Sequence, residues 1–160
     1  MAGYTAKVAG TERGVIEPQA TFSACFGAPF MALDPIVYAH MLEQKIGQHQ
    51  AQVWLVNTGW SGGPYGVGER IKIAYTRAML RAALAGALDN VTYERESAFG
   101  LLTPSVCPDI PPGILDARRT WQDGEAYDEQ ARKLSQMFAD NFRQYAGRVS
   151  KEIEAAGPAA

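Results

Sequence analysis

The stretch that decides the fold begins with Gln52-Val-Trp-Leu-Val56 and continues through Asn57-Thr-Gly-Trp-Ser-Gly-Gly-Pro-Tyr-Gly-Val-Gly68 into Arg70-Ile-Lys-Ile73. The first, apolar piece predicts a short buried strand. Five glycines fall within the next twelve residues and predict a turn. A second extended piece leads into a helix predicted over residues 76–88, which are rich in Ala, Leu and Met. Strand, turn and helix in this order favour an α/β fold.

Two further helices are predicted on either side of this stretch. Asp34-Pro35 supplies an N-cap and a favoured first helical residue, and an imperfect apolar stripe follows until Gly47. Residues 125–146 form the other helix, with apolar side chains at helical spacing: Tyr127, Ala131, Leu134, Phe138, Phe142 and Tyr145. Residues 91–125 contain several prolines and no period, so they are expected to run over the surface. Residues 151–160 are expected to be a flexible tail.

The composition is that of an ordinary soluble globular protein. Its 160 residues suggest one domain, and 15 Lys and Arg against 17 Asp and Glu give a net charge of −2. This balance argues against a dedicated nucleic-acid binder, which usually carries a basic excess. Cys25 and Cys107 form no C-x-x-C pair, so reduced thiols are expected rather than a zinc site. No signal-like or membrane-spanning stretch is visible, and a cytoplasmic location with no membrane partner is expected.

The glycine-rich turn, residues 57–69, is the strongest local motif. Glycines let backbone N–H groups approach a phosphate or a flat base closely, so the turn is a candidate ligand contact. A plain long turn between two extended pieces explains the same composition. The Walker motif is excluded because no lysine follows a glycine, and the dinucleotide fingerprint fails because position 71 is Ile71.

Three residues after this turn are candidates for a base-binding site. Arg70 can stack on a purine or bind an anion, Ile71 can wall the ring, and Thr76 can hydrogen-bond an edge. Residue type alone favours more ordinary roles, namely a surface Arg, a core Ile and a capping Thr.

A polar cluster inside the apparent loop of residues 9–18 is a candidate lid over a ligand. Its members are Thr11, Glu12, Arg13, Gly14 and Glu17. A solvated turn with a weak ion pair would have the same composition. No catalytic residue is predicted, because His40 and His49 lack partners at metal-ligand spacing and no serine lies in a nucleophile elbow.

Longer strings resemble the ATP-dependent phosphoenolpyruvate carboxykinases. They include Gly3-Tyr-Thr-Ala-Lys-Val-Ala-Gly-Thr-Glu-Arg-Gly14 and Glu17-Pro-Gln-Ala-Thr-Phe-Ser-Ala-Cys-Phe-Gly27. They also include Leu55-Val-Asn-Thr-Gly-Trp-Ser-Gly-Gly-Pro-Tyr-Gly-Val-Gly68 and Tyr75-Thr-Arg-Ala-Met79. The resemblance covers nearly all of residues 3–146.

The resemblance implies the C-terminal part of a two-domain α/β fold, with a mixed sheet, flanking helices and a mobile lid loop. Residues 1–150 would be a partial C-terminal nucleotide-binding domain. In it, Arg70, Ile71 and Thr76 would line the adenine and ribose pocket, and residues 9–18 would form the lid. The family converts oxaloacetate and ATP to phosphoenolpyruvate, carbon dioxide and ADP in gluconeogenesis, with Mg²⁺ and Mn²⁺. Glu69 departs from the family's pattern, in which a basic residue is common at this position.

The family's P-loop, metal ligands and substrate arginines have no counterparts that can be mapped onto this chain. The resemblance therefore implies a chain that binds ATP or ADP, meets oxaloacetate or phosphoenolpyruvate only with an N-terminal part, and is inactive alone. Two alternatives stay open. The chain would be half of a split enzyme complemented by an upstream chain, or a non-catalytic nucleotide-binding module.

Overall fold

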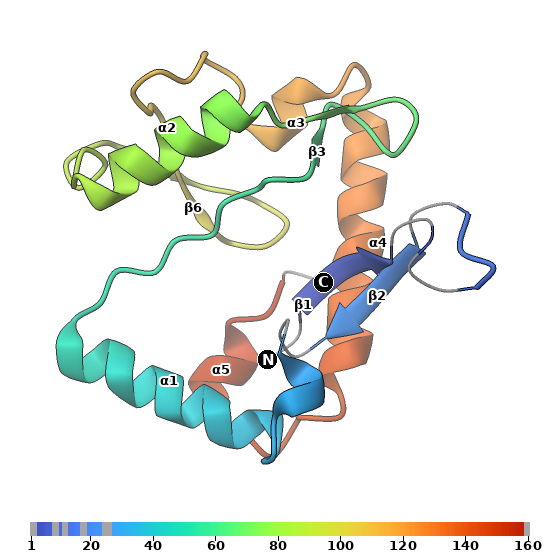
Figure 1. Ribbon diagram of the computed structural model, residues 1–160, viewed down its shortest axis with the longest axis vertical. Helices are drawn as coiled ribbons and strands as arrows, with labels where there is room; N and C mark the ends of the chain where they lie inside the picture. Colours follow the sequence, from blue (N-terminus) through green and yellow to red (C-terminus); the bar gives the residue numbers. More distant parts are fainter. Residues whose placement is uncertain (1–2, 8–9, 11–12, 17–18, 24–26, 159–160) are drawn as a thin grey trace. The chain divides into compact units, whose positions relative to one another are not determined.

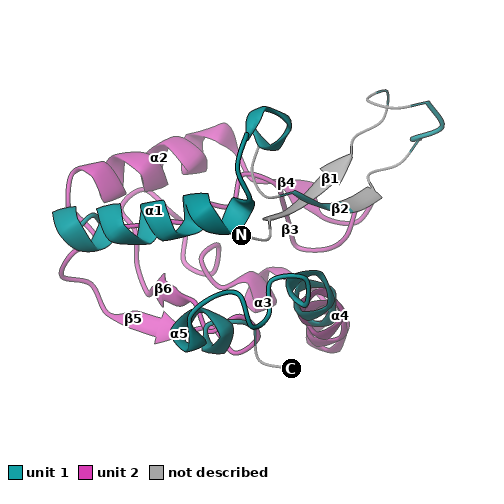
Figure 2. Cartoon of the chain, turned by 90° about the horizontal axis from the view of Figure 1, so that it is seen from below, with its two compact units in different colours: residues 1–52, 136–158 teal, residues 53–135, 159–160 magenta. Residues whose placement is uncertain are grey.

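The structure is a computed structural model that describes residues 3–7, 10, 13–16, 19–23 and 27–158. It divides into two compact units, which Figure 2 colours separately. The first unit combines Met1–Gln52 with Gln136–Pro158, and the second contains Val53–Ser135 with Ala159–Ala160. Helix α4, Gly124–Phe142, contributes residues to both units.

The first unit begins with a β-hairpin followed by a helix. Strands β1, Gly3–Lys7, and β2, Gln19–Ser23, pair antiparallel (Figure 1). The short 3₁₀ helix η1, Ala28–Phe30, precedes helix α1, Pro35–His49. The predicted cap is confirmed, because the side chain of Asp34 accepts the N–H of Ile36 at 2.9 Å.

The C-terminal segment of the first unit is also helical. Helix α5, Lys151–Ala155, lies within the residues expected as a flexible tail, and the side chain of Ser150 caps it. The rings of Phe22 and Phe138 meet edge to face, with centroids 5.2 Å apart. The guanidinium of Arg148 and the carboxylate of Asp34 form an ion pair at 2.6 Å that joins α1 to this segment.

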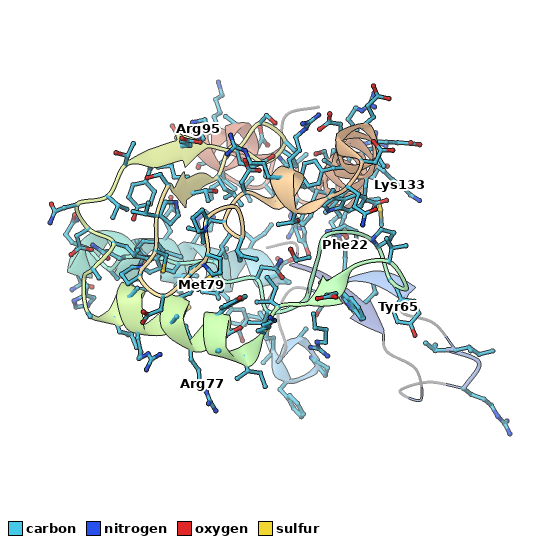
Figure 3. The ribbon with its side chains drawn as sticks, turned by 90° about the horizontal axis from the view of Figure 1, so that it is seen from above. Phe22, Tyr65, Arg77, Met79, Arg95 and Lys133 are labelled. Atoms are coloured by element: carbon cyan, nitrogen blue, oxygen red, sulfur yellow. The ribbon has the colours of Figure 1, made fainter. Side chains whose placement is uncertain are left out.

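The second unit holds the segment that decides the fold. Its elements are β3 Trp60–Ser61, β4 Glu69–Arg70, α2 Ile73–Leu84, β5 Tyr93–Arg95, β6 Leu102–Pro104, α3 Ala117–Thr120 and the start of α4. Ala82, Leu88 and Cys107 form the buried core cluster, against which Trp54 and other apolar side chains pack. Figure 3 shows Arg77 pointing away from α2, with Met79 on the other side of that helix, where it packs on the core.

Two expectations about strands are wrong. Within the described ranges, three two-stranded antiparallel sheets stand in place of the expected mixed sheet. Residues 52–56, expected as a buried strand, have no regular structure, and Val53 and Leu55 are 65% and 77% exposed. The physical reason is that a strand exists only as part of a ladder, and no described strand pairs with this run. In the described part of the chain, no helix is long and apolar enough to cross a membrane.

Candidate functional site

The glycine-rich turn, residues 57–69, is a β-hairpin made by β3 and β4. Trp60 lies opposite Arg70, and Ser61 lies opposite Glu69. The N–H of Ile71 donates to the carbonyl of Gly59 at 2.8 Å. Hydrogen-bonded and non-hydrogen-bonded pairs alternate in an antiparallel ladder, so Trp60 and Arg70 form a non-hydrogen-bonded pair. In such a pair the two side chains lie on one face and close together.

Much of the turn's backbone is occupied by internal hydrogen bonds. Four amides donate to acceptors in the same unit: Gly59 to Asn57 Oδ1, Gly62 to Thr120 Oγ1, and Val67 and Gly68 to the carbonyl of Pro64, at 2.9–3.1 Å. A phosphate oxygen could reach these N–H groups only by displacing those acceptors. These four amides therefore serve the structure of the turn and are not free to bind a ligand.

The three predicted base-site residues lie along one strand-to-helix junction. Arg70 ends β4 and is exposed, Ile71 is half-buried, and Thr76 is half-buried near the start of α2. Within the described ranges, the guanidinium of Arg70 and the hydroxyl of Thr76 have no hydrogen-bond or ion-pair partner. Thr76 does not cap α2, because the N-cap residue is Lys72 and its side chain accepts no cap hydrogen bond. The alternative role of Thr76 as a helix cap is therefore wrong.

The predicted lid, residues 9–18, connects β1 to β2 in the first unit. Arg13 and Gly14 are exposed and lie in a turn. The amide of Gly10 donates to the carbonyl of Val15 at 3.4 Å. The other predicted members, Thr11, Glu12 and Glu17, lie outside the described residues.

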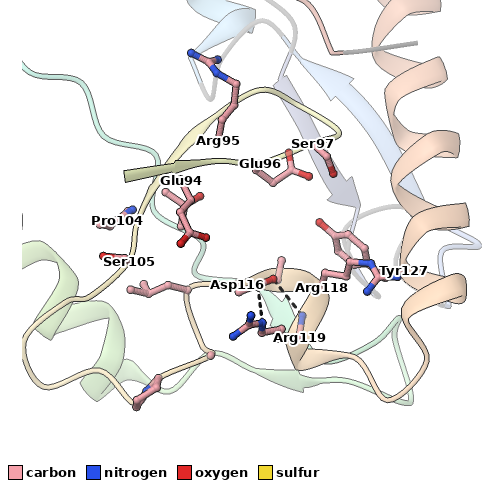
Figure 4. Close-up of a pocket in the computed structure, with 15 residues that line it drawn as sticks. Glu94, Arg95, Glu96, Ser97, Pro104, Ser105, Asp116, Arg118, Arg119 and Tyr127 are labelled. Atoms are coloured by element: carbon pink, nitrogen blue, oxygen red, sulfur yellow. Dashed lines mark hydrogen bonds and ion pairs between the residues drawn. The ribbon is translucent and has the colours of Figure 1, made fainter. Parts of the chain in front are cut away.

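A separate pocket of about 440 Å³ lies in the second unit, lined by residues of β5, β6, α3 and the loop before α3. Figure 4 shows Glu94, Arg95, Glu96 and Ser97 along one side, and Asp116, Arg118, Arg119 and Tyr127 along another. None of Arg70, Ile71 and Thr76 lines it. Sequence reasoning missed this pocket, because all of its lining residues except Tyr127 of α4 come from residues 91–125, where no motif or period marks a site.

The charged groups of the pocket pair largely with one another or with the backbone. Arg118 binds Asp128 through Nε and Nη2 at 2.8 and 2.9 Å, which lowers the pKa of the Asp128 carboxyl and raises that of the Arg118 guanidinium. Asp116 pairs with Arg119 Nε at 3.1 Å. The carboxylate of Glu96 accepts the backbone N–H groups of residues 98 and 99 at 2.8 and 2.7 Å. Ion pairs thus neutralise Arg118, Arg119 and Asp116, whereas Glu94, Arg95 and Glu96 have no ion-pair partner among the described residues.

Tyr127, on the pocket wall, is held in its neutral form. Burial raises the pKa of its phenol, and the nearby carboxylates of Glu96, Asp116 and Asp128 raise it further. The phenol is therefore a hydrogen-bond donor at neutral pH. Among the described residues, no group of three His, Cys, Asp or Glu side chains could hold a metal ion.

Comparisons with known proteins point to one family. The family model described as phosphoenolpyruvate carboxykinase matches residues 1–113. The chain is 59% identical to the phosphoenolpyruvate carboxykinase (ATP) of Thermus thermophilus, over 99% of this chain and 30% of that protein. It is 56% identical to the protein of the same name from Caldanaerobacter subterraneus subsp. tengcongensis, with the same coverage of both chains. The chain thus spans 30% of the length of these curated relatives.

Proposed function

The chain belongs to the phosphoenolpyruvate carboxykinase family, and we propose that it forms the C-terminal, nucleotide-side part of an ATP-dependent phosphoenolpyruvate carboxykinase. In this role Arg70, Ile71 and Thr76 contact the adenine and ribose of ATP, and residues 9–18 act as the lid. The observation that carries the proposal is the similarity of almost the whole chain to relatives that bear this name.

The local geometry supports the assignment of the three base-site residues. The guanidinium of Arg70 is exposed, and neither it nor the hydroxyl of Thr76 is engaged by another described side chain. Both groups can therefore meet a ligand without first breaking a contact in the protein. Ile71 lies between them in the chain and offers apolar surface to a planar ring.

The assembled enzyme would convert oxaloacetate and ATP to phosphoenolpyruvate, carbon dioxide and ADP in the cytoplasm, as a step of gluconeogenesis. The described residues are not suited to bind the Mg²⁺ and Mn²⁺ of that enzyme, because they offer no cluster of three ligating side chains. The contribution of this chain is to bind and orient the nucleotide, since positioning is a large part of phosphoryl-transfer catalysis.

A chimera tests this function. The C-terminal part of the Thermus relative is replaced by this chain, and oxaloacetate decarboxylation is measured with ATP, Mg²⁺ and Mn²⁺. The chimera is expected to be active, whereas the isolated chain shows no turnover. Arg70→Ala in the chimera should raise the KM for ATP about tenfold, because it removes one stacking or cation–π contact with the adenine.

Arg77→Ala is the matched control, because Arg77 is an exposed arginine of the same region that points away from α2 (Figure 3). It should leave the KM for ATP unchanged. A folded but inactive chimera would contradict the proposed function. Equal effects of the two arginine substitutions would contradict the assignment of Arg70 to the adenine pocket.

One observation supports a second candidate as much as the first, namely half of a split enzyme that an upstream chain complements. The exposed apolar side chains of Val53 and Leu55 lie in a run without a strand partner in the described part of the chain. Mixing this chain with the separately expressed N-terminal part of the Thermus relative tests that candidate. Co-elution with activity only in the mixture supports it, and failure of the two parts to associate rejects it.

A further inference from the structure

The β3–β4 hairpin presents an exposed aromatic pair. Trp60 is 42% exposed and Tyr65 is 57% exposed. Their ring centroids are 5.6 Å apart, and the rings meet edge to face at 82°. Large aromatic side chains usually bury most of their surface, so two that pack on each other while both face solvent need a reason.

The neighbour of this pair on the hairpin is Arg70. Trp60 and Arg70 are directly opposite in the ladder and belong to its non-hydrogen-bonded type, so the indole and the guanidinium project from the same face. Neither the indole N–H of Trp60 nor the guanidinium has a polar partner in the described ranges. Indole and guanidinium are both planar groups that can stack on nucleobases.

The hairpin holds this face in a fixed shape. Gly62 anchors the connection to α3 through its hydrogen bond with Thr120 at 3.1 Å. Gly68 packs so closely on the backbone of Ser61 and Gly63 that a side chain at this position would collide with both. A rigid hairpin does not lose the conformational entropy that ordering a flexible loop around a ligand would cost.

We propose that Trp60 is a further base-binding residue of this chain, which stacks on the purine ring of the nucleotide beside Arg70, while Tyr65 supports the indole from the side. The inference rests on the proposed function, which assigns the adenine to Arg70. Stacking on an indole depends on ring area and not on hydrogen-bonding edges. Trp60 therefore favours purines over pyrimidines and does not distinguish adenine from guanine.

The test uses the full 160-residue chain labelled with ¹⁵N. Its three indole N–H resonances, from Trp54, Trp60 and Trp121, are assigned with single Trp→Phe variants. ATP, CTP and inorganic triphosphate are then titrated separately. The Trp60 resonance is expected to shift with ATP, less with CTP and not with triphosphate, while the resonances of Trp54 and Trp121 serve as internal references.

The contribution of Trp60 to nucleotide affinity is measured with variants. Trp60→Leu should weaken ATP binding about tenfold and CTP binding less, while Trp60→Phe keeps most of the affinity. The matched control is Trp121→Phe, since Trp121 and Tyr127 form a similar edge-to-face pair, with centroids 5.7 Å apart, in the same unit. Tyr65→Leu should weaken ATP binding by a smaller factor than Trp60→Leu.

The outcomes separate this inference from the function on which it rests. ATP binding that depends on Arg70 but leaves the Trp60 resonance and the Trp60→Leu affinity unchanged overturns the inference alone. ATP binding that Arg70→Ala does not weaken overturns the adenine assignment and the inference together. A chain that shows no ATP binding at millimolar concentration overturns the inference for this chain, whereas the chimera still decides the proposed function.

Discussion

Replacing Gly68 with alanine should damage the β3–β4 hairpin more than any other glycine substitution in it. A Cβ atom at Gly68 would lie 2.7 Å from the carbonyl oxygen of Ser61 and 2.9 Å from the amide nitrogen of Gly63, and closer still to the carbonyl oxygen of Gly63. All three atoms belong to the backbone, so no side chain can rotate away. The pairing of Ser61 with Glu69 would have to open.

The size of the effect follows from comparison with Gly66. Overpacking costs about 1–3 kcal/mol, and a collision with fixed backbone lies at the upper end, near 3 kcal/mol. Gly66 has a φ of 85° but open space around a Cβ, so Gly66→Ala carries only the left-handed backbone cost of about 1 kcal/mol. The two variants should differ by about 2 kcal/mol.

Urea unfolding followed by tryptophan fluorescence measures this difference, because Trp54, Trp60 and Trp121 all lie in the second unit. With an m-value of about 2 kcal/mol per molar urea, the midpoint should fall about 1.5 M for Gly68→Ala and about 0.5 M for Gly66→Ala. Gly68→Ala should also weaken ATP binding, since the hairpin carries Arg70. Equal midpoints for the two variants would refute the reasoning about close backbone approach.

Three further predictions concern stability and reactivity. Hydrogen bonds from a backbone N–H of α1 and from Arg148 lower the pKa of the Asp34 carboxyl. The ionised carboxylate therefore stabilises the folded protein at pH values above the ordinary aspartate pKa, and this stabilisation is lost as the pH falls through the lowered pKa. Asp34→Asn keeps the cap and should flatten the acid side of a stability–pH curve measured by urea unfolding. Burial raises the pKa of the Cys107 thiol, so in a variant lacking the other cysteine, alkylation at pH 8 should be slow until urea unfolds the protein. Leu88 is 3% exposed, and Leu88→Ala should lower the unfolding free energy by about 2–4 kcal/mol, whereas Leu55→Ala should change it by less than about 0.5 kcal/mol in the same assay.

Local signals in the sequence predict the presence of the helices but not their ends, since α1 continues past Gly47 to His49 and α2 ends at Leu84 instead of residue 88. Asp34-Pro35 predicts the start of α1, because capping needs only neighbouring residues, and the structure confirms it. The apolar spacing over residues 125–146 predicts α4, which runs over Gly124–Phe142. Helix α2 begins at Ile73, three residues before the predicted start, because the chain turns into the helix directly after β4 and Thr76 is not its cap.

Pairing between distant residues was harder to predict. The sequence does not predict strands β5 and β6, since Pro104 and the surrounding residues give no alternating pattern and read only as part of a surface segment. Proline is tolerated in β6 because a two-stranded ladder leaves one edge of each strand free. Composition alone does not reveal which residues face each other across such a ladder.

The same limit applies to the candidate site. The assignment of Arg70, Ile71 and Thr76 to a nucleotide came from the family resemblance, because residue type alone favours ordinary structural roles. The sequence does not say that Trp60 stands opposite Arg70, since the long connection between β3 and β4 leaves the register open until its hydrogen bonds are known. The position of a tryptophan inside the glycine-rich turn is the only sequence signal for this residue.

Residues 53–56 are apolar, as in a buried strand, and yet they do not form a strand in the structure. A run that is apolar at successive positions is typical of a strand buried on both faces. In the second unit, Trp54 packs against the core, while Val53 and Leu55 face outward, and no backbone hydrogen bond of residues 53–56 is found in the described part of the chain. The run thus has one buried face, one exposed apolar face and unused backbone groups. Under the proposed function, these are the groups through which the remainder of the enzyme would join this part, because a neighbouring strand would satisfy the backbone and cover the exposed face at once.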